Sequence, residues 1–144
     1  MTLQNTSEPA SSPQEAYILV VEDSVPNFVT IARLLGLMGV NHCEWKISGW
    51  QVVQFAPTLP QIDLIIMDID LPYEDGYQAL RKLRSHPRLA TTRVVALTAT
   101  ATQEEMIRAR DAGFNGFLSK PLDGERFPSQ IRRVLNGENV WEWR

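Results

Sequence analysis

Four carboxylates and one ammonium group stand where short apolar segments of the chain end. Glu22 and Asp23 follow one apolar run, Asp68 and Asp70 close a second, and Lys120 follows a third. Carboxylates that lie close together repel one another unless they take up protons or bind a hard cation. Mg²⁺ suits such a set because it binds through one or two carboxylates and also accepts phosphate oxygens. These residues predict a magnesium-dependent phosphoryl site in which Lys120 pairs with Asp68 or with a phosphoryl oxygen.

A hydroxyl group is expected at the same place. Thr98 ends the apolar run Val-Val-Ala-Leu. Pro121 restricts the backbone of Lys120 to extended conformations, which helps to aim the lysine side chain. Taken singly, a strand-end acid is usually just solvated and a strand-end threonine usually has a structural role. The prediction of a site therefore depends on all of these residues together.

Short apolar runs alternate with longer segments of helical period, which is typical of a parallel sheet covered on both faces by helices. The expected strands are residues 17–21, a less clear strand within 40–46, and residues 64–67, 94–97 and 116–118. We expect Ser24 to cap the first helix and Thr102 to open the fourth, with Glu105 completing a capping box. Right-handed crossovers then give a doubly wound α/β fold that binds ligands at the carboxyl ends of its strands.

The bulk properties restrict the class of protein. A chain of 144 residues with 44% hydrophobic and 22% charged residues is ordinary for one globular domain. The net charge of -3 argues against a nucleic-acid partner, and no apolar run is long enough to span a membrane. Cys43 is the single cysteine, which agrees with a reducing compartment. A cytoplasmic location is expected because the first residues lack the basic and apolar regions of a secretory signal.

Three regions are expected along the chain. Residues 1–15 are rich in Ser, Thr, Pro and Gln and predict a disordered tail. Residues 16–136 would form the domain, and residues 137–144 a second tail that contains Trp141 and Trp143. The two tryptophans would dock on their own domain or, as the alternative, anchor a homodimer or a partner protein.

Several segments, taken together and in order, resemble the receiver domain of response regulators in two-component signalling. The matching segments are residues 18–24, 65–72 with Gly76, 96–99 and 117–121. The spacing of Asp68, Thr98 and Lys120 is also similar to that of receivers. The resemblance is greatest to stand-alone receivers of the chemotaxis and DivK-like types, and it implies a flavodoxin-like (βα)5 sheet of five parallel strands in the order 2-1-3-4-5.

The resemblance implies a role for each acidic residue and a source of the phosphoryl group. Asp68 would accept it from a sensor histidine kinase or a phosphotransfer protein. Mg²⁺ would be held by Asp23 and Asp68, by Glu22 mainly through water, and by Asp70 through its backbone carbonyl. Such a protein performs only its own phosphotransfer and autodephosphorylation and is otherwise not an enzyme.

The resemblance also implies how the signal leaves the site. Lys120 would neutralise one phosphoryl oxygen, and Thr98 would bond another and move toward it. Phe117 would turn inward to fill the vacated space. Few residues follow Leu135, so the output is expected through protein contacts on the surface of the fourth helix, fifth strand and fifth helix, at about residues 102–135.

Some residues depart from the usual receiver pattern. Glu22 stands where many receivers have aspartate, and Phe117 lacks the hydroxyl group of the common tyrosine. Asp70 adds a carboxylate at a position that varies among receivers. Trp45 and Trp50 stand where smaller or polar residues are usual, and we interpret them as bulky core packing.

Two alternative functions remain open at this point. Residues 65–70 also match a haloacid-dehalogenase-like phosphatase, in which Asp68 would be the nucleophile and Asp70 the general acid. The order of motifs argues against it, because that family places its nucleophile on the first strand. The second alternative is a receiver-like scaffold that binds partners without being phosphorylated.

Overall fold

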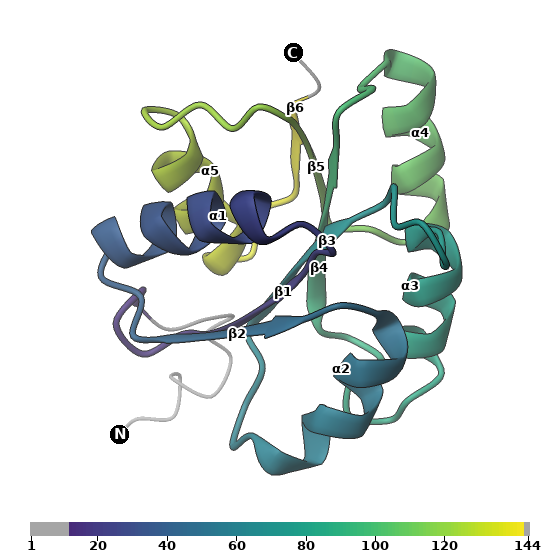
Figure 1. Ribbon diagram of the computed structural model, residues 1–144, viewed down its shortest axis with the longest axis horizontal. Helices are drawn as coiled ribbons and strands as arrows, with labels where there is room; N and C mark the ends of the chain where they lie inside the picture. Colours follow the sequence, from purple (N-terminus) through teal and green to yellow (C-terminus); the bar gives the residue numbers. More distant parts are fainter. Residues whose placement is uncertain (1–11, 143–144) are drawn as a thin grey trace.

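The expected alternation of strands and helices is present in the computed structural model of the protein, which describes residues 12–142 (Figure 1). The strands are β1 (Tyr17–Val21), β2 (His42–Lys46), β3 (Leu64–Asp68), β4 (Arg93–Thr98), β5 (Gly116–Ser119) and β6 (Val140–Glu142). The helices are α1 (Val25–Leu37), α2 (Gly49–Phe55), α3 (Gly76–Arg84), α4 (Gln103–Ala112) and α5 (Phe127–Leu135), with a short 3-10 helix η2 (Ala56–Thr58) after α2. None of the described helices is long and apolar enough to cross a membrane.

The sheet is parallel throughout and has the order β2-β1-β3-β4-β5-β6. The predicted order 2-1-3-4-5 is therefore confirmed, but the predicted number of strands is one too small. The additional strand is β6, which pairs with β5 so that Phe117 lies opposite Trp141. It was missed because three residues are too short to show the alternation from which strands are recognised.

Helices cover both faces of the sheet: α1 and α5 lie on one face, and α2, α3 and α4 lie on the other (Figure 1). The central strand β3 is buried along its whole length. Its Leu64 and Ile66 pack in the cluster beneath α1 and α5, whereas Ile65 and Met67 pack in the cluster beneath α2, α3 and α4. Burial on both faces explains why this strand is a continuous apolar run that ends at Asp68.

The helix starts confirm part of the capping pattern. Ser24 and Thr102 cap α1 and α4 through their hydroxyl oxygens. Glu105 does not complete a capping box, because its carboxylate accepts a hydrogen bond from the Tyr77 hydroxyl at 3.2 Å. The reciprocal box is instead at the start of α3, where Asp75 and Gln78 bond each other's backbone N–H groups. This box begins α3 directly after the loop that follows Asp68.

The ordered structure extends beyond both predicted ends of the domain. Residues 12–15 form a turn whose Gln14 carbonyl accepts a hydrogen bond from the Asn41 side chain at 3.3 Å. At the other end, Glu142 of β6 bonds Arg126, Gln130 and Arg133 of the α5 region. Residues 1–11 and Trp143 lie outside the described residues. Residues just outside the predicted bounds of 16–136 thus contact the domain at both ends.

One half-buried guanidinium group joins three segments at the amino ends of β4 and β5. Arg84, the last residue of α3, donates to the carbonyl oxygens of Leu89 and Thr92 at 3.1 and 2.6 Å. It also donates to the Gly113 carbonyl at 3.1 Å and to the Asn115 side chain at 3.2 Å. Arg84 therefore ties the end of α3 to the segments that lead into β4 and β5.

Candidate functional site

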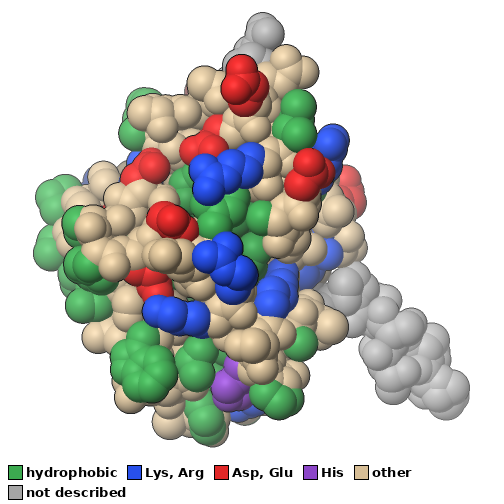
Figure 2. Space-filling model, turned by 90° about the vertical axis from the view of Figure 1, so that its right-hand side faces the viewer, with side chains coloured by type: hydrophobic (Ala, Val, Ile, Leu, Met, Phe, Trp, Pro, Cys, Tyr) green, Lys and Arg blue, Asp and Glu red, His purple; other side chains and the backbone are tan. Residues whose placement is uncertain are grey.

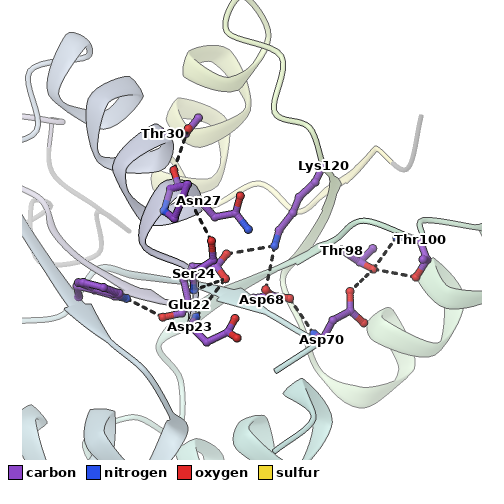
Figure 3. A network of polar contacts seen from close by, with 12 residues as sticks. Glu22, Asp23, Ser24, Asn27, Thr30, Asp68, Asp70, Thr98, Thr100 and Lys120 are labelled. Atoms are coloured by element: carbon purple, nitrogen blue, oxygen red, sulfur yellow. Dashed lines mark hydrogen bonds and ion pairs between the residues drawn. The ribbon is translucent and has the colours of Figure 1, made fainter. Parts of the chain in front are cut away.

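Lys120 contacts two carboxylates at the carboxyl ends of the strands (Figure 3). Its Nζ atom lies 2.9 Å from Asp68 Oδ2 and 3.1 Å from Glu22 Oε1. The exposed fraction is 16% for the Lys120 side chain, 5% for Asp68 and 1% for Glu22. Three strand ends thus bring together the acids of β1 and β3 and the cation that follows β5, as the sequence predicts.

Glu22 is the most deeply buried of these acids and turns inward from the end of β1. Its Oε2 atom accepts hydrogen bonds from the backbone N–H groups of Asp23 and Ser24 at 3.1 and 3.3 Å. Burial raises the pKa of Glu22 to about 7, and the neighbouring Asp68 adds to the shift, although Lys120 opposes it. Glu22 therefore changes its charge near neutral pH in the metal-free protein.

Three of the four predicted metal ligands lie close enough together to share one cation. Oxygen atoms of Glu22, Asp23 and Asp68 all lie within 4.8 Å of one another. An all-oxygen donor set fits Mg²⁺, and the exposed Asp23 leaves the cluster open to water on one side. The carboxylate of Asp70 does not belong to this cluster, and a role for its backbone carbonyl remains a prediction.

Asp70 instead engages the hydroxyl group of Thr98 (Figure 3). Thr98 Oγ1 donates to Asp70 Oδ2 at 2.9 Å and accepts a hydrogen bond from the Thr100 backbone N–H at 3.1 Å. The Asp70 backbone N–H in turn donates to Asp68 Oδ1 at 2.8 Å. Asp70 therefore links the hydroxyl group to the predicted phosphoacceptor, a connection that sequence reasoning missed because it depends on the fold of the loop after β3.

The two unusual tryptophans occupy different surroundings. Trp45 is half-buried: its indole N–H donates to the Glu22 carbonyl at 2.6 Å, and its ring stacks on Phe28 with centroids 4.7 Å apart. Trp50 is 58% exposed, so its interpretation as core packing is wrong. It projects from the first turn of a short helix of which only Gly49 and Val52 are buried.

The aromatic residue on β5 is fully buried. Phe117 has no exposed surface and packs in the cluster beneath α2, α3 and α4. Trp141 lies opposite it on β6 and packs against the same cluster. Sequence reasoning expected the tryptophan tail to dock on its own domain, and for Trp141 the structure shows this arrangement.

Mg²⁺ binding is expected to strengthen as the pH rises, because protein ligands must be deprotonated before they can hold a cation. With a pKa of about 7 for Glu22, its ionised fraction grows roughly tenfold between about pH 6 and pH 8. The apparent affinity should rise by up to about tenfold over this interval. Calorimetric titration with MgCl₂ in buffers of different ionisation enthalpy measures both the affinity and the protons released.

The metal-free protein should show the opposite dependence on pH. The folded pKa of Glu22 is about 7 and its ordinary value is 4.5, so the unfolded chain loses this proton first. The contribution of Glu22 to the free energy of unfolding therefore falls as the pH rises from 4.5 toward 7. In Glu22→Gln, the pH dependence of the Mg²⁺ affinity and that of the free energy of unfolding should both flatten. An unchanged pH dependence of the Mg²⁺ affinity in this variant would refute the assignment to Glu22.

Comparison with known proteins identifies the class to which this fold and site belong. The model of the response regulator receiver domain family matches residues 18–132. The chain therefore belongs to the response regulator receiver domain family. This membership confirms the resemblance seen in the motifs and leaves the phosphatase alternative without support, since Asp68 lies on the third strand of the chain.

The relatives include receivers that are parts of histidine kinases. The chain is 33% identical over 139 residues to the signal transduction histidine-protein kinase BarA of Escherichia coli, covering 95% of this chain and 15% of that kinase. The receiver domain of a Syntrophus aciditrophicus histidine kinase is 32% identical, with a TM-score of 0.72 and coverage of 85% of this chain and 91% of that one.

A second solved structure contains a metal ion. The receiver domain of a sensor histidine kinase from Pseudomonas aeruginosa is described with magnesium coordinated in its active site cleft. It is 32% identical to this chain, with a TM-score of 0.69 and coverage of 83% of this chain and 93% of that one. The acidic cluster of Glu22, Asp23 and Asp68 is thus compatible with the ion found in a related receiver.

Proposed function

We propose that Asp68 accepts a phosphoryl group from a histidine kinase or a phosphotransfer protein in the cytoplasm. The observation that carries this proposal is the contact of one ammonium group with Asp68, inside a cluster of three carboxylates. An Asp68 oxygen would form a bond to phosphorus while the bond from phosphorus to the donor's imidazole nitrogen breaks. When bound, Mg²⁺ offsets the negative charge that gathers on the phosphoryl oxygens.

Residues of the chain contact the Asp68 carboxylate and are placed to bind the incoming phosphoryl group and the metal. Lys120 Nζ lies 2.9 Å from Asp68 Oδ2 and can therefore pair with the negative charge of the phosphoryl group as that group is transferred. The Asp70 backbone N–H holds Asp68 Oδ1 at 2.8 Å and thereby orients the carboxylate. Asp23 and Glu22 supply the remaining oxygen atoms for the metal.

A small phosphodonor tests this proposal. The protein is incubated with acetyl phosphate and MgCl₂, and the mass of one phosphoryl group is sought by mass spectrometry under neutral conditions. We expect an adduct that hydroxylamine removes and that requires Mg²⁺. Asp68→Asn should lose it, whereas Asp70→Asn should keep it and serves as the matched control. Absence of an adduct, or an equal adduct on Asp68→Asn, would refute the proposed function.

Thr98→Ala is expected to accept the phosphoryl group but to transmit a much smaller change to β6. Thr98 donates its hydroxyl hydrogen to Asp70, and it must exchange this partner to bond a phosphoryl oxygen. The change would then pass through Phe117 to Trp141, which lies opposite it. In the unaltered protein we expect the indole signal of Trp141 to shift in ¹⁵N–¹H spectra when beryllofluoride and Mg²⁺ are added. In Thr98→Ala this shift should shrink by more than half, while a full shift would exclude Thr98 as the link.

The surface proposed for the downstream partner differs in detail from the expectation. Because β6 pairs with the free side of β5, a partner that approaches between α4 and α5 meets β6 before β5. Trp141 is half-buried there, and Ile107 of α4 is 37% exposed. We therefore propose α4, β6 and α5 as the output surface of this receiver.

A further inference from the structure

A hollow lies outside the Asp68 site, between the first turn of α2 and the side of α3. Its volume is about 530 Å³, which is within the range of sites that bind ligands. The side chains that matter for its chemistry are Trp50 of α2, Tyr73 and Glu74 of the loop after β3, and Arg81 and Lys82 of α3. We name this hollow the α2–α3 groove.

Large apolar side chains stand exposed at this groove. Trp50 is 58% exposed, Tyr73 is 59% exposed, and the neighbouring Ile47 is 40% exposed. The Tyr73 hydroxyl donates to the Ile47 carbonyl at 2.9 Å, so the ring is held in place although it faces solvent. Exposed apolar patches on folded domains commonly mark binding surfaces, and tryptophan and tyrosine are enriched among the residues that dominate such binding.

One positively charged side chain of the groove has no acidic partner among the described residues. The buried Glu74 carboxylate accepts a hydrogen bond from the Gly49 backbone N–H at 2.9 Å and forms an ion pair with Lys82, so these two charges offset each other. Arg84 and Arg88, further along, are bonded to backbone carbonyl oxygens. Within residues 12–142, the guanidinium group of the exposed Arg81 forms no hydrogen bond or ion pair with another residue.

The surroundings of Arg81 favour an anionic ligand. Figure 2 shows this side of the molecule, on which lysine and arginine side chains lie across the centre, with acidic side chains around them and apolar side chains exposed nearby. A phosphate-bearing ligand such as a nucleotide fits poorly, because the Glu74 carboxylate lines the groove and only one cation is free. A single carboxylate, held by both nitrogen atoms of the guanidinium group, matches Arg81 better.

We propose that the α2–α3 groove binds an acidic segment of a partner protein that carries a large apolar side chain next to a carboxylate. The apolar side chain would lie against Trp50 and Tyr73, and the carboxylate would pair with Arg81. Tyr73 and Glu74 belong to the same loop as Asp70, so the bound segment would sit beside the phosphorylation site without occupying it. This binding does not depend on the function proposed for Asp68.

Peptide titration of the unphosphorylated protein tests the inference. The probe is a capped decapeptide of aspartate and glutamate around a central leucine-phenylalanine pair. Two matched peptides carry either lysines in place of the acids or alanines in place of the apolar pair. The readout is the indole N–H signal of Trp50 in ¹⁵N–¹H spectra, assigned with Trp50→Phe. We expect saturable shifts with the acidic apolar peptide and none with the other two.

Substitutions distinguish the groove from general attraction between opposite charges. Arg81→Glu should weaken binding by about tenfold or more, because a charge-assisted contact is lost. Arg132→Glu makes the same charge change on the exposed surface of α5 and should leave binding unaltered. Asp68→Asn should also bind normally, which separates this result from failure of the proposed phosphorylation.

Three outcomes would overturn the inference. One is the absence of any shift at Trp50 with the acidic apolar peptide, and another is equal binding of the lysine peptide. The third is an equal loss of affinity in Arg81→Glu and Arg132→Glu, which would show that only the overall charge matters. Circular dichroism of each variant checks that the fold is retained.

Discussion

Lys120→Met is expected to lower the free energy of unfolding by about 3 kcal/mol at about pH 8, at the lower end of the range for breaking a buried ion pair. Methionine keeps the length and apolar stem of lysine but leaves Asp68 and Glu22 without their shared cation. The loss is large because both carboxylates are almost fully buried. Burial lowers the pKa of Lys120, but the bonds to Asp68 and Glu22 outweigh this effect and raise it above its usual value. The lysine therefore stays charged throughout the neutral range. Urea unfolding in the presence of a chelator measures the loss.

The size of this loss should depend on pH through Glu22. A carboxyl whose pKa is already about 7 can take up a proton when the lysine is removed, so the loss should shrink as the pH falls below 7. Mg²⁺ should restore more stability to the variant than to the unaltered protein, because it supplies the missing positive charge. Lys46→Met is the matched control: Lys46 lies over the Phe55 ring at 3.7 Å, and its loss should cost about 1 kcal/mol or less. Equal losses in both variants would contradict the role given to Lys120.

Gly76→Ala is expected to destabilise the protein by about 3 kcal/mol, as severe overpacking of a core position does. A Cβ atom at Gly76 would lie 2.5 Å from the Ile69 Cγ2 atom and 2.6 Å from the Ile69 Cα atom. The Cα atom cannot move aside as a side chain could, because Ile69 directly follows Asp68 at the end of β3. The methyl group would therefore push on the strand end that carries the phosphoacceptor, and the phosphoryl adduct should form more slowly in whatever protein remains folded.

Gly36→Ala provides a control with the opposite sign. Gly36 lies near the end of α1, is exposed, and has nothing within 4 Å of an added Cβ atom. Alanine at a helical position restricts the unfolded chain and should stabilise the protein by about 0.5 to 1 kcal/mol. Both free energies come from urea unfolding followed by circular dichroism. If the two variants shift the midpoint in the same direction, the close contact at Gly76 does not govern stability.

The sequence predicts the central part of this fold because the buried strands are short and continuously apolar. In β1 and β3 each apolar run stops at an acidic residue, so Glu22 and Asp68 mark the strand ends directly. Lys120 is found by the same reasoning after β5. Asp23 is adjacent to Glu22 in the chain, and it comes close to Asp68 because β1 pairs with β3, as the expected strand order places them.

Contacts that depend on loops could not be predicted in the same way. The carboxylate of Asp70 turns to Thr98 because the loop after β3 folds back to Gly76, whose N–H donates to the Ile69 carbonyl. The exposure of Trp50 depends on which face of a seven-residue helix meets the sheet, and so short a helix has no clear apolar stripe. In both cases the residue type is evident in the sequence, but its surroundings are set by backbone geometry that no local pattern encodes.

The four hydrogen bonds of Arg84 have a mechanical consequence. They fasten the amino ends of β4 and β5 to α3, while Thr98 and Lys120 stand at the opposite ends of the same two strands. We expect a strand that is anchored at one end to move less near the anchor than at its other end. A movement that starts at Asp68 should therefore be largest at the carboxyl ends of β4 and β5 and smallest near Arg84, which would make that end a reference for detecting motion.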